Sequence, residues 1–138
     1  MRDIEFQIER KILKIGNALL NTRSADLKKY DLTLVQSETL LFYVSNPGAS
    51  ILDLKEYLDI SHQAARNLIE RLKVKNLVYA ETSSEDARYK KIYLTELGEN
   101  ICDKLTWMGS HVGQNLLRDV SETERQELLR LLLKINDN

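Results

Sequence analysis

Residues 50–94 decide the fold: SILDLKEYLDISHQAARNLIERLKVKNLVYAETSSEDARYKKIYL. Ser50, with Asp53 three residues later, predicts the start of a short helix, because the two side chains can cap each other's backbone. Asp59 predicts a tight turn after that helix, and Ser61 is placed to cap the next one. A short helix, a tight turn and a second helix form the helix-turn-helix plan.

The second half of this stretch predicts a β-hairpin. Asn76 is a plausible left-handed stop for the preceding helix. Two runs typical of strands follow, at residues 77–80 and 91–94, and the polar residues 81–88 separate them as the hairpin tip. A hairpin directly after a helix-turn-helix makes a winged helix.

The second helix of this plan has one apolar face and one polar face. Apolar residues recur at i, i+3, i+4 and i+7 and are expected to point inward: Ala65, Leu68, Ile69 and Leu72. The start of the polar face holds side chains that can donate to and accept from base edges in a major groove. These DNA-binding candidates are Ser61, His62, Gln63, Arg66 and Asn67. A solvated surface face is the alternative interpretation of the same pattern.

The flanking segments predict further helices. Thr33 with Gln36 begins one that Asn46-Pro47-Gly48 ends, and Ser121 with Glu124 begins the last one. Apolar stripes at helical spacing run along both terminal regions, including Ile4, Ile8 and Ile12 near the start and Leu128, Leu132 and Ile135 near the end. The expected fold class is mainly α with a small β-hairpin wing.

Composition limits the possible classes of protein. The 138 residues fit a single domain, with 43% hydrophobic residues and a net charge of −1. The single cysteine, Cys102, excludes an internal disulfide framework and fits a reducing compartment. No apolar run approaches the roughly 20 residues that span a bilayer, and the first residues are charged, unlike a signal peptide. We therefore expect a cytoplasmic protein that does not enter a membrane.

Positive charge is concentrated around the helix-turn-helix. Residues 60–93 carry seven positive and four negative side chains, a net charge of +3, whereas residues 1–59 carry −1 and residues 94–138 carry −3. A phosphate-binding surface needs only such local positive charge. Lys73, Lys90 and Arg88 are therefore further DNA-binding candidates, and an arginine at a hairpin tip can enter a narrow minor groove. Asp86 is positioned to stabilise the wing by pairing back onto the helical body.

The chain resembles the MarR family of bacterial transcription regulators. The motifs that carry the resemblance are LKEYLDISH (54–62), NLIERL (67–72), KNLV (75–78), the wing signature EDAR (85–88) and the exit LTELG (94–98), and VSETE (120–124) resembles the start of the family's last helix. The D-x-R wing followed by L-T-x-x-G is the specific part. The sequence departs from the family pattern at Lys55, Asn76 and Tyr89, and it lacks the usual wing proline, which weakens the expected grip of the wing on phosphate.

The resemblance implies a homodimer that binds a double-stranded DNA operator of pseudo-palindromic sequence. It implies a winged lobe at about residues 32–96 and dimerisation helices at about residues 1–31 and 97–138. Residues 61–75 of each subunit would enter successive major grooves, and Arg88 a minor groove. The resemblance also implies release from DNA by a small aromatic or phenolic effector. We expect repression, because a dimer on a promoter can block polymerase without a further surface.

Other chemistry has little support in the sequence. Cys102 is interpreted as a small hydrophobe rather than a redox sensor, and Trp107 with Met108 as core rather than ligand pocket. His62 and His111 lack neighbours at metal-ligand spacing, so we expect neither a metal nor another cofactor. There is no nucleophile–base pair or phosphate-binding glycine loop, which argues against an enzyme. The alternative function is a winged-helix dimer that docks a partner protein without binding specific DNA.

Overall fold

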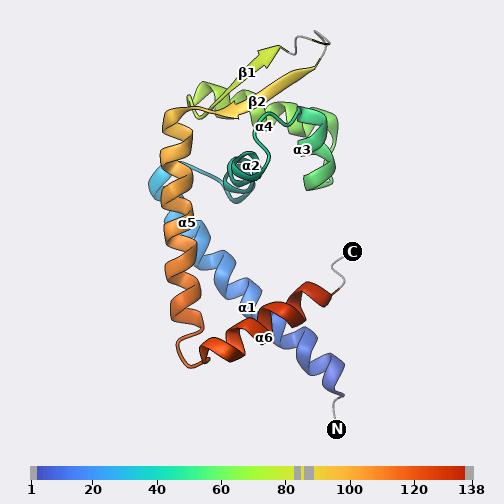
Figure 1. Ribbon diagram of the computed structural model, residues 1–138, viewed down its shortest axis with the longest axis vertical. Coiled ribbons are helices and arrows are strands. Elements are labelled where there is room, and N and C mark those ends of the chain that lie inside the picture. The colour runs from blue at the N-terminus through green and yellow to red at the C-terminus, as the bar shows by residue number, and fades with distance from the viewer. Residues whose placement is uncertain (1–2, 83–84, 86–88, 136–138) are drawn as a thin grey trace. The chain divides into compact units, whose positions relative to one another are not determined.

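The computed structural model describes residues 3–82, 85 and 89–135, and its elements follow the predicted order (Figure 1). Helices and strands are α1 (Ile4–Leu27), a short 3₁₀ helix η1 (Lys28–Tyr30), α2 (Leu34–Ser45), α3 (Ile51–Leu58), α4 (His62–Val74), β1 (Val78–Thr82), β2 (Lys90–Leu94), α5 (Glu96–Leu116) and α6 (Glu122–Lys134). The chain divides into two compact units, Met1–Leu105 and Thr106–Asn138, so the boundary falls within α5. The predicted fold class, mainly α with a β-hairpin, is confirmed.

The capping residues predicted from sequence begin their helices as expected. Full capping boxes, in which each side chain binds the other's backbone N–H, start α2, α3 and α6, whereas α4 has a single hydroxyl cap. The pairs are Thr33 with Gln36, Ser50 with Asp53 and Ser121 with Glu124, and the Ser61 hydroxyl accepts the Ala64 N–H at 3.0 Å. Each cap satisfies a backbone N–H that has no partner within the helix.

The backbone turns sharply at three aspartate or asparagine residues in the left-handed region. Asp59 has φ 53° between α3 and α4, where the sequence predicted a tight turn, and Asn76 has φ 61° after α4, where it predicted a left-handed stop. Asp31 has φ 54° after η1, a turn that the sequence gave no reason to expect. Asparagine and aspartate tolerate this conformation better than other residues with a Cβ atom.

The hairpin pairs β1 with β2 in an antiparallel register that matches Ala80 with Ile92. Both strands extend further toward the tip than residues 77–80 and 91–94, so the expected tip of residues 81–88 begins later, after Thr82. The physical reason is favourable cross-strand pairing, because Glu81 lies opposite Lys91.

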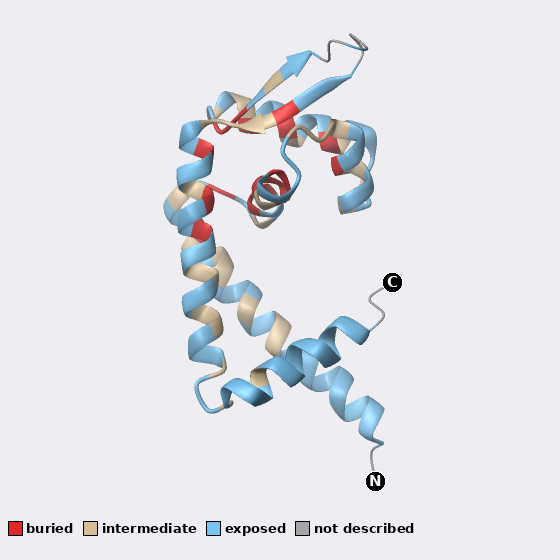
Figure 2. Cartoon of the chain, in the orientation of Figure 1, coloured by how far each residue is buried: buried red, intermediate tan, exposed pale blue. Residues whose placement is uncertain are grey.

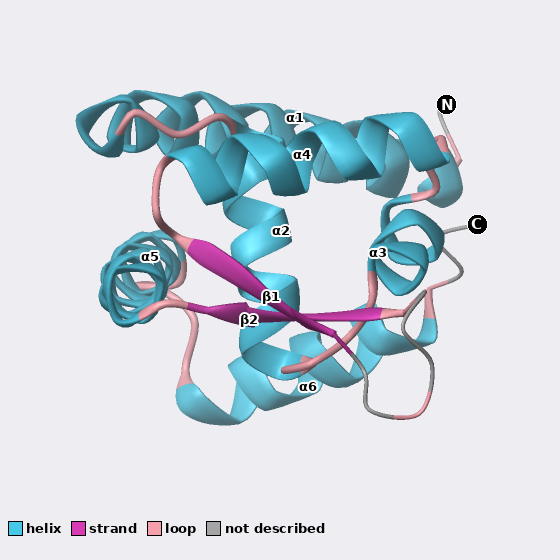
Figure 3. Ribbon diagram, turned by 90° about the horizontal axis from the view of Figure 1, so that it is seen from above, coloured by secondary structure: helices cyan, strands magenta, loops and turns pink. Residues whose placement is uncertain are grey.

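The segment before α3 is hydrogen-bonded to the other edge of β2. The Gly48 N–H donates to the Ile92 carbonyl at 2.9 Å, and the Ile92 N–H donates to the Ala49 carbonyl at 3.1 Å. Gly48 has φ 83°, a conformation that costs glycine little. These bonds fix the segment before α3 to the hairpin, so the wing and the helix-turn-helix form one structure (Figure 3).

The core of the first unit lies among α2, α3, α4 and the hairpin (Figure 2). Burying each large apolar side chain there contributes about 1.5–3 kcal/mol. The fully buried residues include Leu27, Leu40, Tyr43, Leu54, Ile69, Leu72 and Ile92. Of the inward face predicted for α4, Ala65, Ile69 and Leu72 are buried and Leu68 is half-buried.

The exit motif of residues 94–98 joins the hairpin to α5 through close backbone contacts. The Thr95 N–H donates to the Leu77 carbonyl at 3.0 Å, and its hydroxyl donates to the Asn76 carbonyl at 2.7 Å. The same hydroxyl accepts the Gly98 N–H at 3.0 Å. A Cβ atom at Gly98 would lie 2.1 Å from the Leu77 carbonyl oxygen, so only glycine fits here.

The second unit contains the last part of α5 and all of α6. Arg125 closes the turn between them, because its guanidinium donates to the Val120 carbonyl at 2.9 Å and to the Leu117 carbonyl at 2.5 Å. Trp107 stacks on His111 one turn later, with ring centroids 3.8 Å apart. Within the residues that the structure describes, no helix is long and apolar enough to cross a membrane.

Candidate nucleic-acid interface

The polar face of α4 is presented to solvent by the turn before it. The left-handed Asp59 ends α3, and the cap at Ser61 starts α4 two residues later. His62, Arg66 and the other predicted base-reading residues are exposed, whereas the opposite face of α4 packs into the core. This arrangement follows from the spacing of the apolar residues, which leaves one stripe of the helix without a packing partner.

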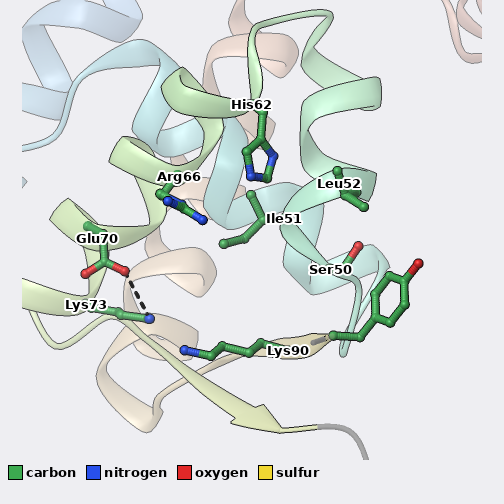
Figure 4. Close-up of a pocket in the computed structure, with 9 residues that line it drawn as sticks. Ser50, Ile51, Leu52, His62, Arg66, Glu70, Lys73 and Lys90 are labelled. Carbon is green, nitrogen blue, oxygen red and sulfur yellow. Dashed lines mark hydrogen bonds and ion pairs between the residues drawn. The ribbon is translucent and has the colours of Figure 1, made fainter. Parts of the chain in front are cut away.

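A groove of about 610 Å³ runs between the start of α3, the outer face of α4 and the residues around the start of β2 (Figure 4). It brings four of the predicted DNA-binding residues together: His62, Arg66, Lys73 and Lys90. Figure 4 shows Lys73 and Lys90 extending from opposite sides into the same part of the groove. Positive side chains from a helix and from the wing therefore share one concave surface, and this would favour an anionic ligand.

Five further residues line this groove that the sequence analysis did not select: Ser50, Ile51, Leu52, Glu70 and Tyr89. Glu70 is an exposed residue of α4, and nothing in the sequence showed that its carboxylate would lie among cations. Lys73 donates to it at 3.2 Å, so part of the positive charge of Lys73 is already neutralised. Of the four predicted DNA-binding residues that line the groove, Arg66 and Lys90 therefore provide the stronger attraction for a phosphate.

Gln63 and Asn67 lie one helical turn apart and are joined by a hydrogen bond. The Gln63 side-chain N–H donates to the Asn67 side-chain oxygen, Oδ1, at 3.0 Å. The bond leaves the side-chain oxygen of Gln63 and the side-chain amide NH₂ of Asn67 for other partners. A fixed amide pair loses less side-chain entropy when it binds a base edge than two mobile side chains would.

The remaining predicted residues fall into two groups. Ser61 uses its hydroxyl oxygen as the cap of α4 and keeps its hydroxyl hydrogen for a further bond. Asp86 and Arg88, expected to stabilise the wing and to enter a minor groove, lie outside the described residues. Their roles remain predictions.

The apolar stripes of the terminal helices are exposed in the single chain. Within α1, all of whose residues are described, Leu27 alone is buried, and Ile4 is 65% exposed. Every residue of α6 is exposed or half-buried. The six residues predicted for dimerisation, Ile4, Ile8, Ile12, Leu128, Leu132 and Ile135, are all among the exposed large hydrophobics.

Cys102 lies on the buried side of α5, as expected for a small hydrophobe. Burial, reinforced by the nearby carboxylates of Asp103 and Glu99, raises the pKa of the thiol to about 11. A thiol with so high a pKa carries very little of the reactive thiolate at neutral pH. Among the described residues, no group of histidine, cysteine or carboxylate side chains is arranged to hold a metal ion.

Comparison with known proteins agrees with this architecture. Residues 30–88, from η1 to the wing, match the family model described as MarR family. An uncharacterised HTH-type transcriptional regulator, YybA of Bacillus subtilis, is 25% identical over 131 residues, which cover 95% of this chain and 87% of that protein. The solved structure of the transcriptional regulator SlyA is 28% identical with a TM-score of 0.79, covering 92% of this chain and 89% of that one.

Over residues 30–88 the chain matches the MarR family of transcription regulators, and over most of its length it is similar to the regulators YybA and SlyA. Its fold extends to other members: MepR of Staphylococcus aureus, solved in complex with DNA, aligns with a TM-score of 0.77 over 96% of each chain at 24% identity. MarR of E. coli aligns with a TM-score of 0.78 at 22% identity, over 97% of this chain and 96% of that one.

The contacts of the exit motif, L-T-x-x-G, explain why this chain has these residues there. Thr95 and Gly98 are two of the three defined letters of L-T-x-x-G, and both contact the backbone that ends α4 and begins β1. The relatives that the chain resembles are transcription regulators, a class of DNA-binding proteins rather than enzymes. The residues that the groove collects are suited to binding rather than to bond making or breaking.

Proposed function

We propose that this MarR-family regulator binds a pseudo-palindromic DNA operator as a homodimer and represses transcription from it. In this proposal residues 32–96 are the DNA-binding lobe, and residues 1–31 and 97–138 provide the dimerisation helices. α4 enters the major groove, where Gln63, Arg66 and Asn67 contact base edges. Ser61 and His62, at the start of the same helix, also face base edges. Lys73 and Lys90 contact the DNA backbone, Arg88 reaches a minor groove, and Asp86 stabilises the wing.

The groove between α4 and β2 is the observation that carries the proposal. It joins Arg66 of the helix with Lys90 of the wing, so one DNA backbone could be held from two sides. The amide pair of Gln63 and Asn67 lies next to it on the exposed face of α4. Amide side chains pair with adenine and arginine with guanine, so these residues would supply sequence preference beside phosphate contacts. The DNA complex of MepR, a protein of the same fold, supports DNA binding as the function of this lobe.

The exposed stripes of α1 and α6 support the homodimer. A helix of 24 residues with a single buried side chain has little tertiary packing, which is what normally stabilises helices in proteins. Apolar patches of this length mark protein–protein contacts. A second copy of this chain would cover Ile4, Ile8 and Ile12 with the corresponding stripes of its own terminal helices, in the arrangement that the MarR resemblance implies.

Equilibrium binding to DNA tests the proposal. The wild-type protein is titrated with its own promoter region and with a scrambled duplex at several salt concentrations. We expect tight, sequence-dependent binding that weakens steeply with salt, because phosphate contacts release counterions. Arg66→Ala should reduce specific affinity about tenfold and relax the preference at one base position.

Arg71→Ala is the matched control, because Arg71 is an exposed arginine of the same helix that does not line the groove. Arg88→Ala should reduce affinity for all sequences and lower the salt dependence. Equal and feeble binding to both duplexes would contradict specific DNA binding. That outcome would favour the second candidate, a winged-helix dimer that docks a partner protein, for which the Glu70 carboxylate in the groove is the supporting observation.

We further propose that a small aromatic or phenolic effector releases the dimer from DNA, as the MarR resemblance implies. Release requires only a small change in the separation of the two α4 helices, since half-sites on DNA must lie about one helical turn apart. A screen of such compounds against the protein–operator complex tests this. We expect an active compound to release the protein from the operator and to stay bound to the released protein.

A further inference from the structure

Lys75, the last residue of the segment that the MarR resemblance directs toward DNA, makes its contacts on the other side of the lobe. Its ammonium group donates to the Asp31 backbone carbonyl and, at 3.3 Å, to the Gln36 side-chain oxygen. It also forms an ion pair with the Asp31 carboxylate at 3.5 Å. A lysine has three N–H donors, and three oxygens of the α1–α2 junction surround this one.

The contacts of Lys75 connect two elements with different tasks. Lys75 is the C-cap of α4, whose outer face lines the groove. Asp31 is the left-handed residue that ends η1, directly after α1, and Gln36 belongs to the capping box that begins α2. Lys75 therefore joins the end of the proposed reading helix to the end of the proposed dimerisation helix.

The local chemistry restricts the movement of this connection, although the Asp31 carboxylate itself is 98% exposed. The Lys75 side chain is 28% exposed, so it is not a mobile surface lysine. Gln36 cannot turn away easily, because the same oxygen accepts the Thr33 N–H at 3.2 Å. The Asp31 carbonyl is held by its left-handed backbone and by the Leu32 N–H bond to Leu27. A positive charge at the last turn of α4 also interacts favourably with the helix dipole.

We propose that Lys75 is a positioning residue that fixes the orientation of α4 relative to α1, and through it the separation of the two reading helices in the dimer. It is not a phosphate contact. This inference rests on the proposed DNA binding and on the homodimer, and it deepens both: operator spacing would be set by a residue that does not touch DNA. Because half-site spacing is read geometrically, a loosened α4 tolerates spacings that the wild-type protein rejects.

The test compares Lys75→Met with Lys73→Met, a matched substitution of the lysine that lines the groove. The probe is a DNA duplex selected by the wild-type protein from a random pool, together with versions in which the half-sites are one base pair closer or further apart. For Lys75→Met we expect about tenfold weaker binding to the selected duplex, a smaller preference over the altered spacings, and an unchanged salt slope. For Lys73→Met we expect a salt slope lower by about one and an unchanged spacing preference. Lys75→Arg, which keeps a cationic donor, should restore most of the spacing preference.

Two results would overturn the inference while leaving DNA binding established. One is a Lys75→Met protein with wild-type affinity at every spacing. The other is a lowered salt slope with unchanged spacing preference, which would make Lys75 a phosphate contact. A wild-type protein that selects no sequence would instead remove the proposed function and this inference with it.

If circular dichroism shows that Lys75→Met does not fold, the same DNA-binding comparison is made with Asp31→Asn. This variant is expected to fold, because asparagine accepts the left-handed backbone and Asp31 is exposed. Removing a negative charge would by simple electrostatics strengthen DNA binding at all spacings. The positioning role predicts the opposite sign on the selected duplex, so stronger binding at every spacing would overturn the inference.

Discussion

Replacing Gly98 with alanine tests whether the family's exit motif is a steric requirement. The added Cβ atom would lie 2.1 Å from the Leu77 carbonyl oxygen and 3.1 Å from its carbonyl carbon. Real Cβ atoms keep at least 3.0 Å from such atoms, so α5 and the start of β1 would have to separate by about 0.9 Å. The obstructing atom is backbone, and it cannot rotate away as a side chain would.

The cost follows from three contributions. Forcing backbone apart in a packed region costs about 1–3 kcal/mol. The Leu77 carbonyl also accepts the Thr95 N–H, and weakening that bond costs about 1 kcal/mol. Alanine returns about 1 kcal/mol through its higher helix propensity. We therefore expect Gly98→Ala to lower the free energy of unfolding by about 1–3 kcal/mol.

Urea unfolding followed by circular dichroism measures this, at one fixed protein concentration because dimerisation contributes to stability. Gly113→Ala is the matched control, since Gly113 also lies within α5 and, apart from the neighbouring backbone of its own helix, no atom comes within 4 Å of the Cβ position. The control should gain up to about 1 kcal/mol from helix propensity. If Gly98→Ala proved as stable as Gly113→Ala, the steric explanation of the motif would be refuted.

Three further substitutions or titrations have defined outcomes. Arg125→Met should lower the free energy of unfolding by about 1–2 kcal/mol, because two turn carbonyls lose their donor. In the same urea assay Arg130→Met, which breaks an exposed ion pair, should have a much smaller effect. Tyr43→Phe should cost about 1 kcal/mol, because its buried hydroxyl donates to the Ser50 carbonyl at 3.1 Å; wild-type stability would show that this bond contributes nothing. Cys102 has a raised pKa in the folded state, so the folded protein binds this proton more tightly than the unfolded chain, and stability should fall as pH rises from about 9 toward 11. Cys102→Ala should lack that part of the pH dependence, and a disulfide-exchange reagent should label the wild-type thiol slowly at pH 7 until the protein unfolds.

Much of the fold was predictable because local signals determine it. Ser50, Ser61 and Thr33 cap helices through contacts within four residues, and Asn76 ends α4 through its own backbone preference. Such contacts are visible in the sequence as residue types at fixed spacing. The polar face of α4 was predictable for the same reason, since helical periodicity alone separates Arg66 from Ile69.

The parts that were not predictable depend on contacts between distant residues. The pairing of Gly48 with Ile92 joins residues 44 positions apart, and nothing in the local sequence marks it. Lys75 was included in the reading segment because the MarR resemblance implies that residues 61–75 enter the major groove. Its actual partners are Asp31 and Gln36, and only the folded chain brings them together.

The α4 helix is held at both ends by residues that do not line the groove. At its start, the cap at Ser61 and the left-handed Asp59 fix its direction relative to α3. At its end, Lys75 binds the α1–α2 junction, and Thr95 binds the carbonyl of Asn76. Because both anchors use side chains outside the groove, the residues between them can vary to suit an operator without loosening the helix. The charge of the groove and the geometry of the helix are thus set by different residues, so substitutions can change sequence preference and operator spacing separately.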